Sequence, residues 1–194
     1  MNRLDATRVL IAALGGERDL PVTPIVASLG HPAYDLFAAG DRAANFYTWG
    51  SMGLASSIGL GLAIARPELR VFVLDGDGSL LMNLGSLATI GWTAPENLVL
   101  IVWDNEEYGT TGGQKSATAH GADLAAAARA LGIRSAMTVR SERELRSTIA
   151  DVRRDAGPHV IVAKVDEAAP TAKPPLDYIL IKDRFMTAIG SHQR

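Results

Sequence analysis

The feature that most constrains the fold is a pair of short apolar runs, each followed at once by a polar, glycine-containing segment. Residues 71–74 (VFVL) lead into Gly76-Asp77-Gly78-Ser79, and residues 98–103 (LVLIVW) lead into residues 104–109 (DNEEYG). Continuous apolar runs of this length are typical of strands that are buried on both faces of a parallel sheet. Because the carboxyl ends of parallel strands meet at one edge, we expect both polar segments at the edge where open α/β sheets bind ligands.

Strand-like and helical patterns alternate along the rest of the chain. Strands are expected at residues 22–29, 45–47, 71–74, 98–103, 136–139 and 160–165. Helices are expected at residues 5–14 (with a stop at Gly15-Gly16), 34–39, 52–65, 80–90, 122–131 and 142–154. This alternation predicts an α/β fold: one doubly wound parallel sheet with helices on both faces, spanning residues 1–194 with a C-terminal tail at residues 168–194.

Composition excludes several classes of protein. With 194 residues, 47% of them hydrophobic, the chain can bury the core of one domain. A net charge of −2 argues against nucleic-acid binding. We expect no membrane association and a cytoplasmic location, because there is no apolar leader and no apolar run long enough to span a bilayer. The absence of cysteine excludes thiolate catalysis and cysteine-ligated clusters on this chain.

The two polar segments together can hold a magnesium diphosphate. Mg²⁺ prefers oxygen ligands in near-octahedral geometry, usually one or two carboxylates together with phosphates and water. Asp77 offers a carboxylate, Asn105 an amide oxygen and Glu107 a main-chain carbonyl. These three residues are the predicted metal ligands.

Glycines and a helix start are expected to receive the diphosphate. Gly76 and Gly78 flank the metal carboxylate, and without a Cβ their backbone can approach a phosphate closely. The amides of Gly78, Ser79 and Leu80 are expected to open a helix, where free N–H groups favour phosphate oxygens. A Gly-Asp-Gly tripeptide alone is weak evidence, since it is common in turns, and the second segment is what strengthens the interpretation.

These motifs resemble the diphosphate-binding (PP) domain of thiamine-diphosphate (ThDP) enzymes. That family combines Gly-Asp-Gly with Asn-Asn after a gap of about this length, and here the first asparagine is replaced by Asp104. Residues 48–57 (TWGSMGLASS) resemble the pyrimidine-contacting turn of the family. The resemblance implies that the carbonyl of Gly50 accepts a hydrogen bond from the cofactor's amino group and that Met52 bends ThDP into a V shape. The cofactor-binding residues implied are Gly50, Ser51, Met52, Gly76, Asp77, Gly78, Ser79, Asn105, Glu107, Tyr108, Gly109 and Thr110.

The loop at residues 108–115 has a composition suited to anions. Paired glycines expose backbone amides, and Thr110, Thr111 and the ammonium of Lys115 lie within the same few residues. The alternative is an ordinary solvated loop. His31 follows a predicted strand and could contact substrate, although a lone histidine is structural about as often. The candidate catalytic residues are therefore Gly50, Met52, His31 and Thr111.

ThDP enzymes also need a pyrimidine-binding (PYR) domain that donates a catalytic glutamate, and 194 residues leave no room for one. The resemblance thus implies a PYR-domain α subunit as partner, in an α2β2 or higher assembly. The motifs are most similar to the matching parts of sulfopyruvate and phosphonopyruvate decarboxylases. They imply a ThDP- and Mg²⁺-dependent decarboxylase subunit acting on a small anionic 2-oxo acid. An acetolactate-type carboligase subunit and a non-catalytic ThDP-binding regulatory subunit remain the alternatives.

Overall fold

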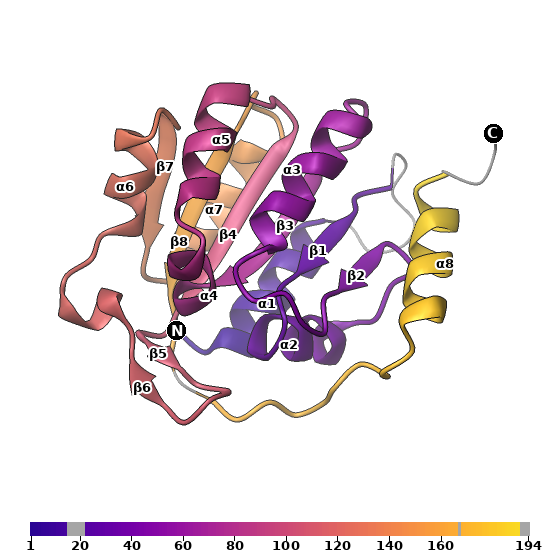
Figure 1. Cartoon of the computed structure of the whole chain (residues 1–194), viewed down its shortest axis with the longest axis horizontal. Coiled ribbons are helices and arrows are strands. Elements are labelled where there is room, and N and C mark those ends of the chain that lie inside the picture. Colours follow the sequence, from indigo (N-terminus) through magenta and orange to yellow (C-terminus); the bar gives the residue numbers. More distant parts are fainter. Residues whose placement is uncertain (15–21, 167, 191–194) are drawn as a thin grey trace.

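The computed structural model describes residues 1–14, 22–166 and 168–190 and consists of a six-stranded parallel sheet between two layers of helices (Figure 1). The strand order is β2-β1-β3-β4-β8-β7. The strands are β1 (Ile25–Ala27), β2 (Asn45–Tyr47), β3 (Val71–Gly76), β4 (Leu98–Asp104), β7 (Ser135–Val139) and β8 (His159–Lys164). The predicted doubly wound α/β sheet is confirmed. The predicted helix stop at Gly15-Gly16 and the last residues of the tail lie outside the described residues.

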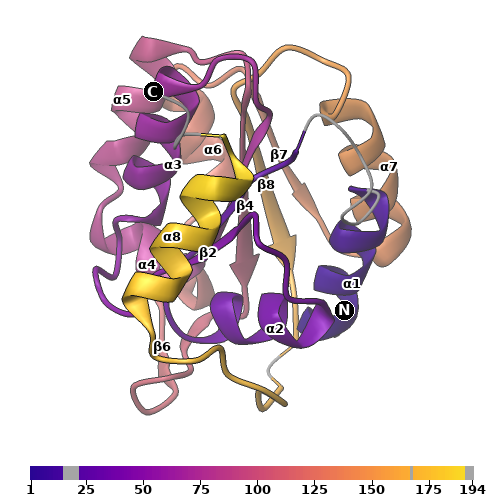
Figure 2. The same ribbon diagram turned by 90° about the vertical axis from the view of Figure 1, so that its right-hand side faces the viewer.

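The helices cover both faces of the sheet, as Figure 2 shows edge-on. One apolar core joins the first face to α1 (Arg3–Ala13), α2 (His31–Ala39) and α7 (Glu142–Val152). The other core joins the second face to α3 (Ala55–Ala65), α4 (Asp77–Met82), α5 (Gly85–Thr93) and α6 (Leu124–Ala130). Two separate cores of this kind are what a doubly wound sheet requires. Among the described residues, no helix combines the length and the apolar character needed to cross a membrane.

The two central strands are the ones that the apolar runs predicted. Every residue of β4 is buried, and β3 pairs with it in parallel from Val71↔Leu98 to Gly76↔Trp103. Because the strands end side by side, the segments after Gly76 and after Asp104 meet at one edge of the sheet. This placement of the two polar segments is confirmed.

Some element boundaries differ from the prediction for local reasons. The helix predicted at residues 52–65 begins only at Ala55, because Ser51 and Gly53 have left-handed φ values of 62° and 86°. The helix predicted at 80–90 is two helices, α4 and α5, interrupted where Asn83 leaves the helical region. The helix predicted at residues 34–39 starts three residues earlier, at His31, because Pro32 suits a first helical turn.

The loop predicted at residues 108–115 forms a small hairpin. Its strands are β5 (Glu107–Tyr108) and β6 (Gln114–Lys115), paired antiparallel, and a 3₁₀ turn, η2 (Ala117–His120), follows. The C-terminal helix α8 (Tyr178–Ala188) lies along the β2 edge of the sheet (Figure 2), where the rings of Phe46 and Phe185 are 5.3 Å apart.

Candidate functional site

A cavity of about 50 Å³ lies at the carboxyl edge of the sheet. Among the predicted site residues, the structure brings the following around it: His31, Met52, Gly76, Asp77, Gly78, Ser79, Asn105, Glu107, Tyr108, Gly109 and Thr110. Arg3 and Trp103 also line it, and neither was predicted as a site residue. Gly50, Ser51 and Thr111 are exposed and do not line the cavity.

The three predicted metal ligands converge on one another. One polar atom of the Asn105 carboxamide lies 3.0 Å from the main-chain oxygen of Glu107 and 3.1 Å from Oδ1 of Asp77. With Mg–O distances of 2.0–2.1 Å, neighbouring ligands of an octahedral Mg²⁺ are about 3 Å apart. With its amide nitrogen in this position, Asn105 donates two hydrogen bonds; with its oxygen there, three oxygens face one another as cation ligands do. The donor set therefore fits Mg²⁺ in both chemistry and spacing.

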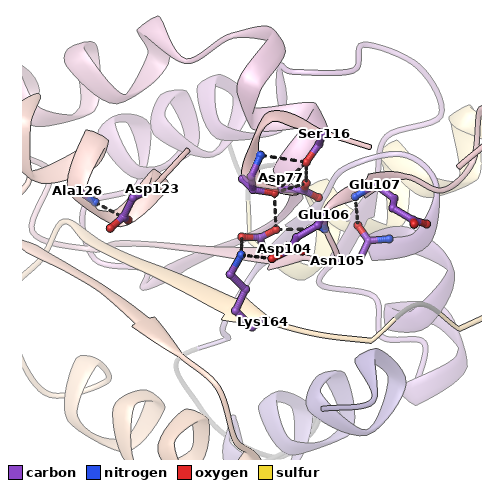
Figure 3. Close-up of polar contacts among 10 residues, drawn as sticks. Asp77, Asp104, Asn105, Glu106, Glu107, Ser116, Asp123, Ala126 and Lys164 are labelled. Atoms are coloured by element: carbon purple, nitrogen blue, oxygen red, sulfur yellow. Dashed lines mark hydrogen bonds and ion pairs between the residues drawn. The ribbon is translucent and has the colours of Figure 1, made fainter. Parts of the chain in front are cut away.

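Asp77 is almost completely enclosed, with 1% of its surface exposed. Its Oδ2 accepts a hydrogen bond from the Ser116 hydroxyl (Figure 3). The Thr118 hydroxyl lies 3.0 Å from the same oxygen and also within hydrogen-bond distance of Asp104, so its single proton can be donated to either carboxylate. Burial raises the pKa of Asp77, the charge of Asp104 raises it further, and the two hydroxyls oppose the shift. A buried carboxylate in this position is costly unless a cation compensates it. This electrostatic demand is a second reason to place a metal here.

Asp104, which replaces an asparagine of the family motif, has its own set of partners. It accepts hydrogen bonds from the Thr118 hydroxyl at 2.8 Å and the Glu106 amide at 3.2 Å, and it forms an ion pair with Lys164 at 2.7 Å. Lys164 comes from β8, where it stands opposite Asp104 in the strand register, and it also reaches Glu106 at 2.8 Å. The extra negative charge of Asp104 is thus balanced within the fold.

Sequence reasoning missed Ser116, Thr118 and Lys164. Ser116 and Thr118 lie 39 and 41 residues from Asp77 in the chain, and Lys164 lies 58 residues from Glu106. Only the β4–β8 register, which the apolar pattern does not define, could have indicated Lys164.

The glycines of the first segment have different environments. A Cβ on Gly78 would lie 2.5 Å from the ring of Tyr108, whereas one on Gly76 would meet nothing within 4 Å. Contact with the ring of Tyr108 is therefore one reason for glycine at position 78. Close approach of the backbone to a phosphate is the other reason, the one predicted from the sequence. The helix start expected near Gly78 is present, since α4 begins at Asp77. Asp77, Gly78 and Ser79 of its first turn line the cavity, and the first N–H groups of a helix have no partner within the helix.

The pyrimidine-type turn is fixed through Gly53. The Gly53 amide donates to Oγ of Ser79 at 2.9 Å, and the Gly53 carbonyl accepts from the Asn83 side chain at 3.0 Å. Ser79 in turn contacts the Ser28 hydroxyl at 3.0 Å. Helix α4 therefore begins at the predicted metal ligand. Ser79 in its first turn and Asn83 just after its last residue hold Gly53, the residue after Met52. Asn83 and Ser28 were not foreseen.

His31 faces the hairpin loop. A Cβ on Gly109 would be 2.7 Å from Cε1 of His31, and one on Gly30 would be 2.9 Å from Cγ2 of Thr110. Burial, and then the charge of Arg3, lower the pKa of His31 to about 4. Arg3 forms an ion pair with Asp35, both residues being 2% exposed. His31 is therefore a neutral hydrogen-bonding group at physiological pH.

Lys115 and Thr111 lie farther out. The ammonium of Lys115 forms an ion pair with the Glu107 side chain, so its charge is already partly compensated. The Thr111 hydroxyl is exposed and donates to the Tyr108 carbonyl at 3.4 Å. The sequence places the Lys115 ammonium among the groups that suit anions, and in the structure this ammonium is shared with the Glu107 carboxylate.

Comparison with known proteins identifies the family of the chain. Residues 31–163 match the family model of the thiamine pyrophosphate enzymes, C-terminal TPP-binding domain. The chain belongs to this family.

Within this family, the similar proteins include decarboxylases of 2-oxo acids. The chain is 40% identical over 191 residues to the sulfopyruvate decarboxylase subunit beta of Methanocaldococcus jannaschii, covering 96% of each chain. It is 41% identical over 155 residues to the phosphonopyruvate decarboxylase of Streptomyces viridochromogenes, covering 78% of this chain and 38% of that one. A Rhodococcus jostii thiamine diphosphate-dependent 4-hydroxybenzoylformate decarboxylase shares the fold, with a TM-score of 0.72, 16% identity and coverage of 87% and 33%.

Proposed function

We propose that the chain is the diphosphate-binding β subunit of a ThDP- and Mg²⁺-dependent decarboxylase acting on 3-sulfopyruvate or 3-phosphonopyruvate. The observation that carries the proposal is the convergence of Asp77, Asn105 and the Glu107 carbonyl at the edge of the cavity. The high identity to a sulfopyruvate decarboxylase subunit beta supports the choice of reaction. We further propose that residues 1–194 act as one PP domain with a tail.

In this proposal each group of residues has one task. Bound ThDP supplies the electron sink that decarboxylation of a 2-oxo acid requires. Asp77, Asn105 and the Glu107 carbonyl hold the metal, and the amides at the start of α4 receive the diphosphate. Gly50 orients the pyrimidine, and Met52, held through Gly53, supports the bent cofactor. Tyr108 and Gly109 close the diphosphate side of the cavity.

A second subunit completes the site in the proposal. It would carry a PYR domain and supply the catalytic glutamate, most simply in an α2β2 assembly. Two observations support a second subunit: the Methanocaldococcus jannaschii relative is named a subunit beta, and the pyrimidine turn of this chain is exposed to solvent. Gly50 and Ser51 are exposed there, and Leu54 and Ile58 in the same region are 43% and 37% exposed. Apolar side chains beside an incomplete site are expected to be covered by the partner.

The substrate's second anionic group is assigned to the hairpin loop. Thr110 and the neutral His31 line the cavity, and Thr111 and Lys115 lie farther out on the hairpin, exposed to solvent. Donors placed for a sulfonate or phosphonate leave pyruvate's methyl group without equivalent interactions. The second anionic group of the substrate would therefore be recognised by amides, by hydroxyls and by the Lys115 ammonium, which is already paired with Glu107.

Reconstitution tests the proposal. The pure chain is expected to show little decarboxylation, and addition of a PYR-domain subunit should restore it. The complex is then assayed with sulfopyruvate, phosphonopyruvate and pyruvate in parallel. Lys115→Ala and Thr111→Val should raise KM for the dianionic acids several-fold without changing ThDP affinity. Full turnover by the single chain contradicts the shared site, and equal use of pyruvate, or formation of acetolactate, supports the carboligase alternative. ThDP binding without any turnover supports the regulatory alternative.

A further inference from the structure

Glu106 occupies an unusual backbone conformation between two predicted metal ligands. Its φ is 64°, in the left-handed region that a residue with a Cβ rarely adopts. The turn at Glu106 directs the main chain so that the carbonyl of Glu107 comes back to within 3.0 Å of the Asn105 side chain. A conformation of this kind persists only where its surroundings hold it.

Three contacts hold Glu106. Its amide donates to Oδ1 of Asp104 at 3.2 Å, and its carbonyl accepts from the Ser116 amide at 3.0 Å. Its carboxylate, at the end of a side chain that is 44% exposed, binds Lys164 at 2.8 Å. Of these partners, Lys164 holds Glu106 in two ways. It forms an ion pair with the Glu106 carboxylate, and it also forms one with Asp104, the residue that accepts the hydrogen bond from the Glu106 amide.

The contacts form a closed ring between the two predicted metal-binding segments, and Figure 3 shows its ion pairs of Lys164 with Asp104 and Glu106. The ring runs from Asp77 through Ser116, Glu106, Lys164, Asp104 and Thr118 back to Asp77. Lys164 is the cation among these residues, and it faces two carboxylates. Without it, Asp104 and Glu106 would repel each other across the turn that shapes the ligand set.

We propose that Lys164 is a positioning residue for the metal site: it holds Glu106 in the left-handed conformation that turns the Glu107 carbonyl toward Asp77 and Asn105. The inference rests on the proposed Mg²⁺–ThDP site and adds to it a residue from a strand outside both motifs. It also gives a reason for Asp104, because an asparagine could not neutralise Lys164.

The test measures the Mg²⁺ dependence of ThDP binding by tryptophan fluorescence, without turnover, on the complex of the full chain with its partner subunit. Lys164→Met is expected to weaken apparent Mg²⁺ affinity about 10- to 100-fold, the usual range for residues that orient metal ligands. Lys164→Arg should retain most of the affinity. Lys182→Met is the matched control, since Lys182 forms an exposed pair with Asp183 on α8.

Two rescue variants separate positioning from simple charge balance. Glycine adopts left-handed φ without strain, so adding Glu106→Gly to Lys164→Met should restore Mg²⁺ affinity, whereas adding Asp104→Asn should not. If Lys164→Met does not fold, Glu106→Ala and Glu106→Gly decide, because the alanine variant should bind Mg²⁺ several-fold more weakly than the glycine variant. Rescue by Asp104→Asn alone, unchanged affinity in Lys164→Met, or equal affinity of the two Glu106 variants would overturn the inference. ThDP binding by the wild-type complex that ignores Mg²⁺ would instead overturn the proposed metal site.

Discussion

The two halves of the site differ in how they are held. On the metal side, Asp77 is buried and belongs to a ring of ion pairs and hydrogen bonds that includes Lys164. On the pyrimidine side, Gly50 and Ser51 are exposed, and the turn is held by neutral hydrogen bonds, including two of Gly53 and two from Thr48 to the Ala27 carbonyl. The proposed metal half is thus preorganised by the chain itself, and the proposed pyrimidine half has an exposed surface.

The two halves also differ in electrostatic cost to the folded state of the isolated chain. Burial and the neighbouring Asp104 raise the pKa of Asp77, so its ionised form is costly to the fold, and in the proposed site a cation would offset that cost. The pyrimidine turn carries no comparable charge among its described residues, and its left-handed Ser51 and Gly53 are conformational features. Substitutions should therefore affect cofactor affinity on one side and cofactor geometry on the other.

The largest effect is expected for Asp77→Asn. Loss of the carboxylate should weaken Mg²⁺-dependent ThDP binding by a factor of about 100 or more, since the metal loses its charged ligand. The apo chain should keep its Tm or gain stability, because a buried charge has been removed. Calorimetry gives the affinity, and melting curves with and without ThDP and Mg²⁺ give the stability. A ligand-induced rise in Tm equal to that of wild type would refute the assignment of Asp77.

Asn83→Ala should alter geometry rather than affinity. Without the Asn83 amide, the Gly53 carbonyl loses its partner and Met52 is less firmly placed. We expect kcat of the reconstituted complex to fall about ten- to a hundredfold, with a change in the circular dichroism of bound ThDP. Asn83→Gln is the conservative control. If Asn83→Ala lowered the Mg²⁺ affinity as strongly as Asp77→Asn does, the proposed difference between the two halves of the site would be wrong.

His31→Asn should raise KM for the dianionic substrate only a few-fold, the scale of one neutral hydrogen bond. Because burial and Arg3 lower the pKa of His31 to about 4, it stays neutral at pH 7, and its substitution should leave the activity profile above about pH 5.5 unchanged. The unfolded chain binds this proton near pH 6.5, so His31 makes the fold less stable as pH falls toward 4. Activity measured against pH, together with acid unfolding of both proteins, checks both statements. A limb near pH 6.5 that disappears in His31→Asn would contradict the neutral role.

The smallest effect on the chain itself is expected for Gly61→Ala. A Cβ at Gly61 would meet nothing within 4 Å, and alanine is the better helix former, so stability should rise by about 0.5–1 kcal/mol. If α3 meets the partner, the added methyl should weaken subunit association several-fold, as measured by titration calorimetry. Gly59→Ala provides the contrast, because its Cβ would lie 2.1 Å from Val73 and should destabilise the chain. Unchanged association in Gly61→Ala would place the contact elsewhere.

The sequence predicted what depends on continuous burial and local chemistry. Strands β3 and β4 are apolar on both faces, so their ends and the adjacency of Asp77 to Asn105 could be inferred. It could not predict features set by tertiary contacts. The late start of α3 depends on left-handed Ser51. The role of Thr118 depends on how the turn η2 packs against Asp77 and Asp104. The role of Lys164 depends on a strand register that apolar residues alone leave undefined.

Helix α8 has a consequence for solubility. A strand at the border of a sheet presents unsatisfied backbone groups that can template pairing with another chain. Phe185 packs α8 against Phe46 of β2, and Arg184 pairs with Asp41 at 2.6 Å beside the same border. The helix therefore shields this border from edge-to-edge association. A chain shortened before α8 would keep its ligand-binding residues and become prone to aggregation through β2.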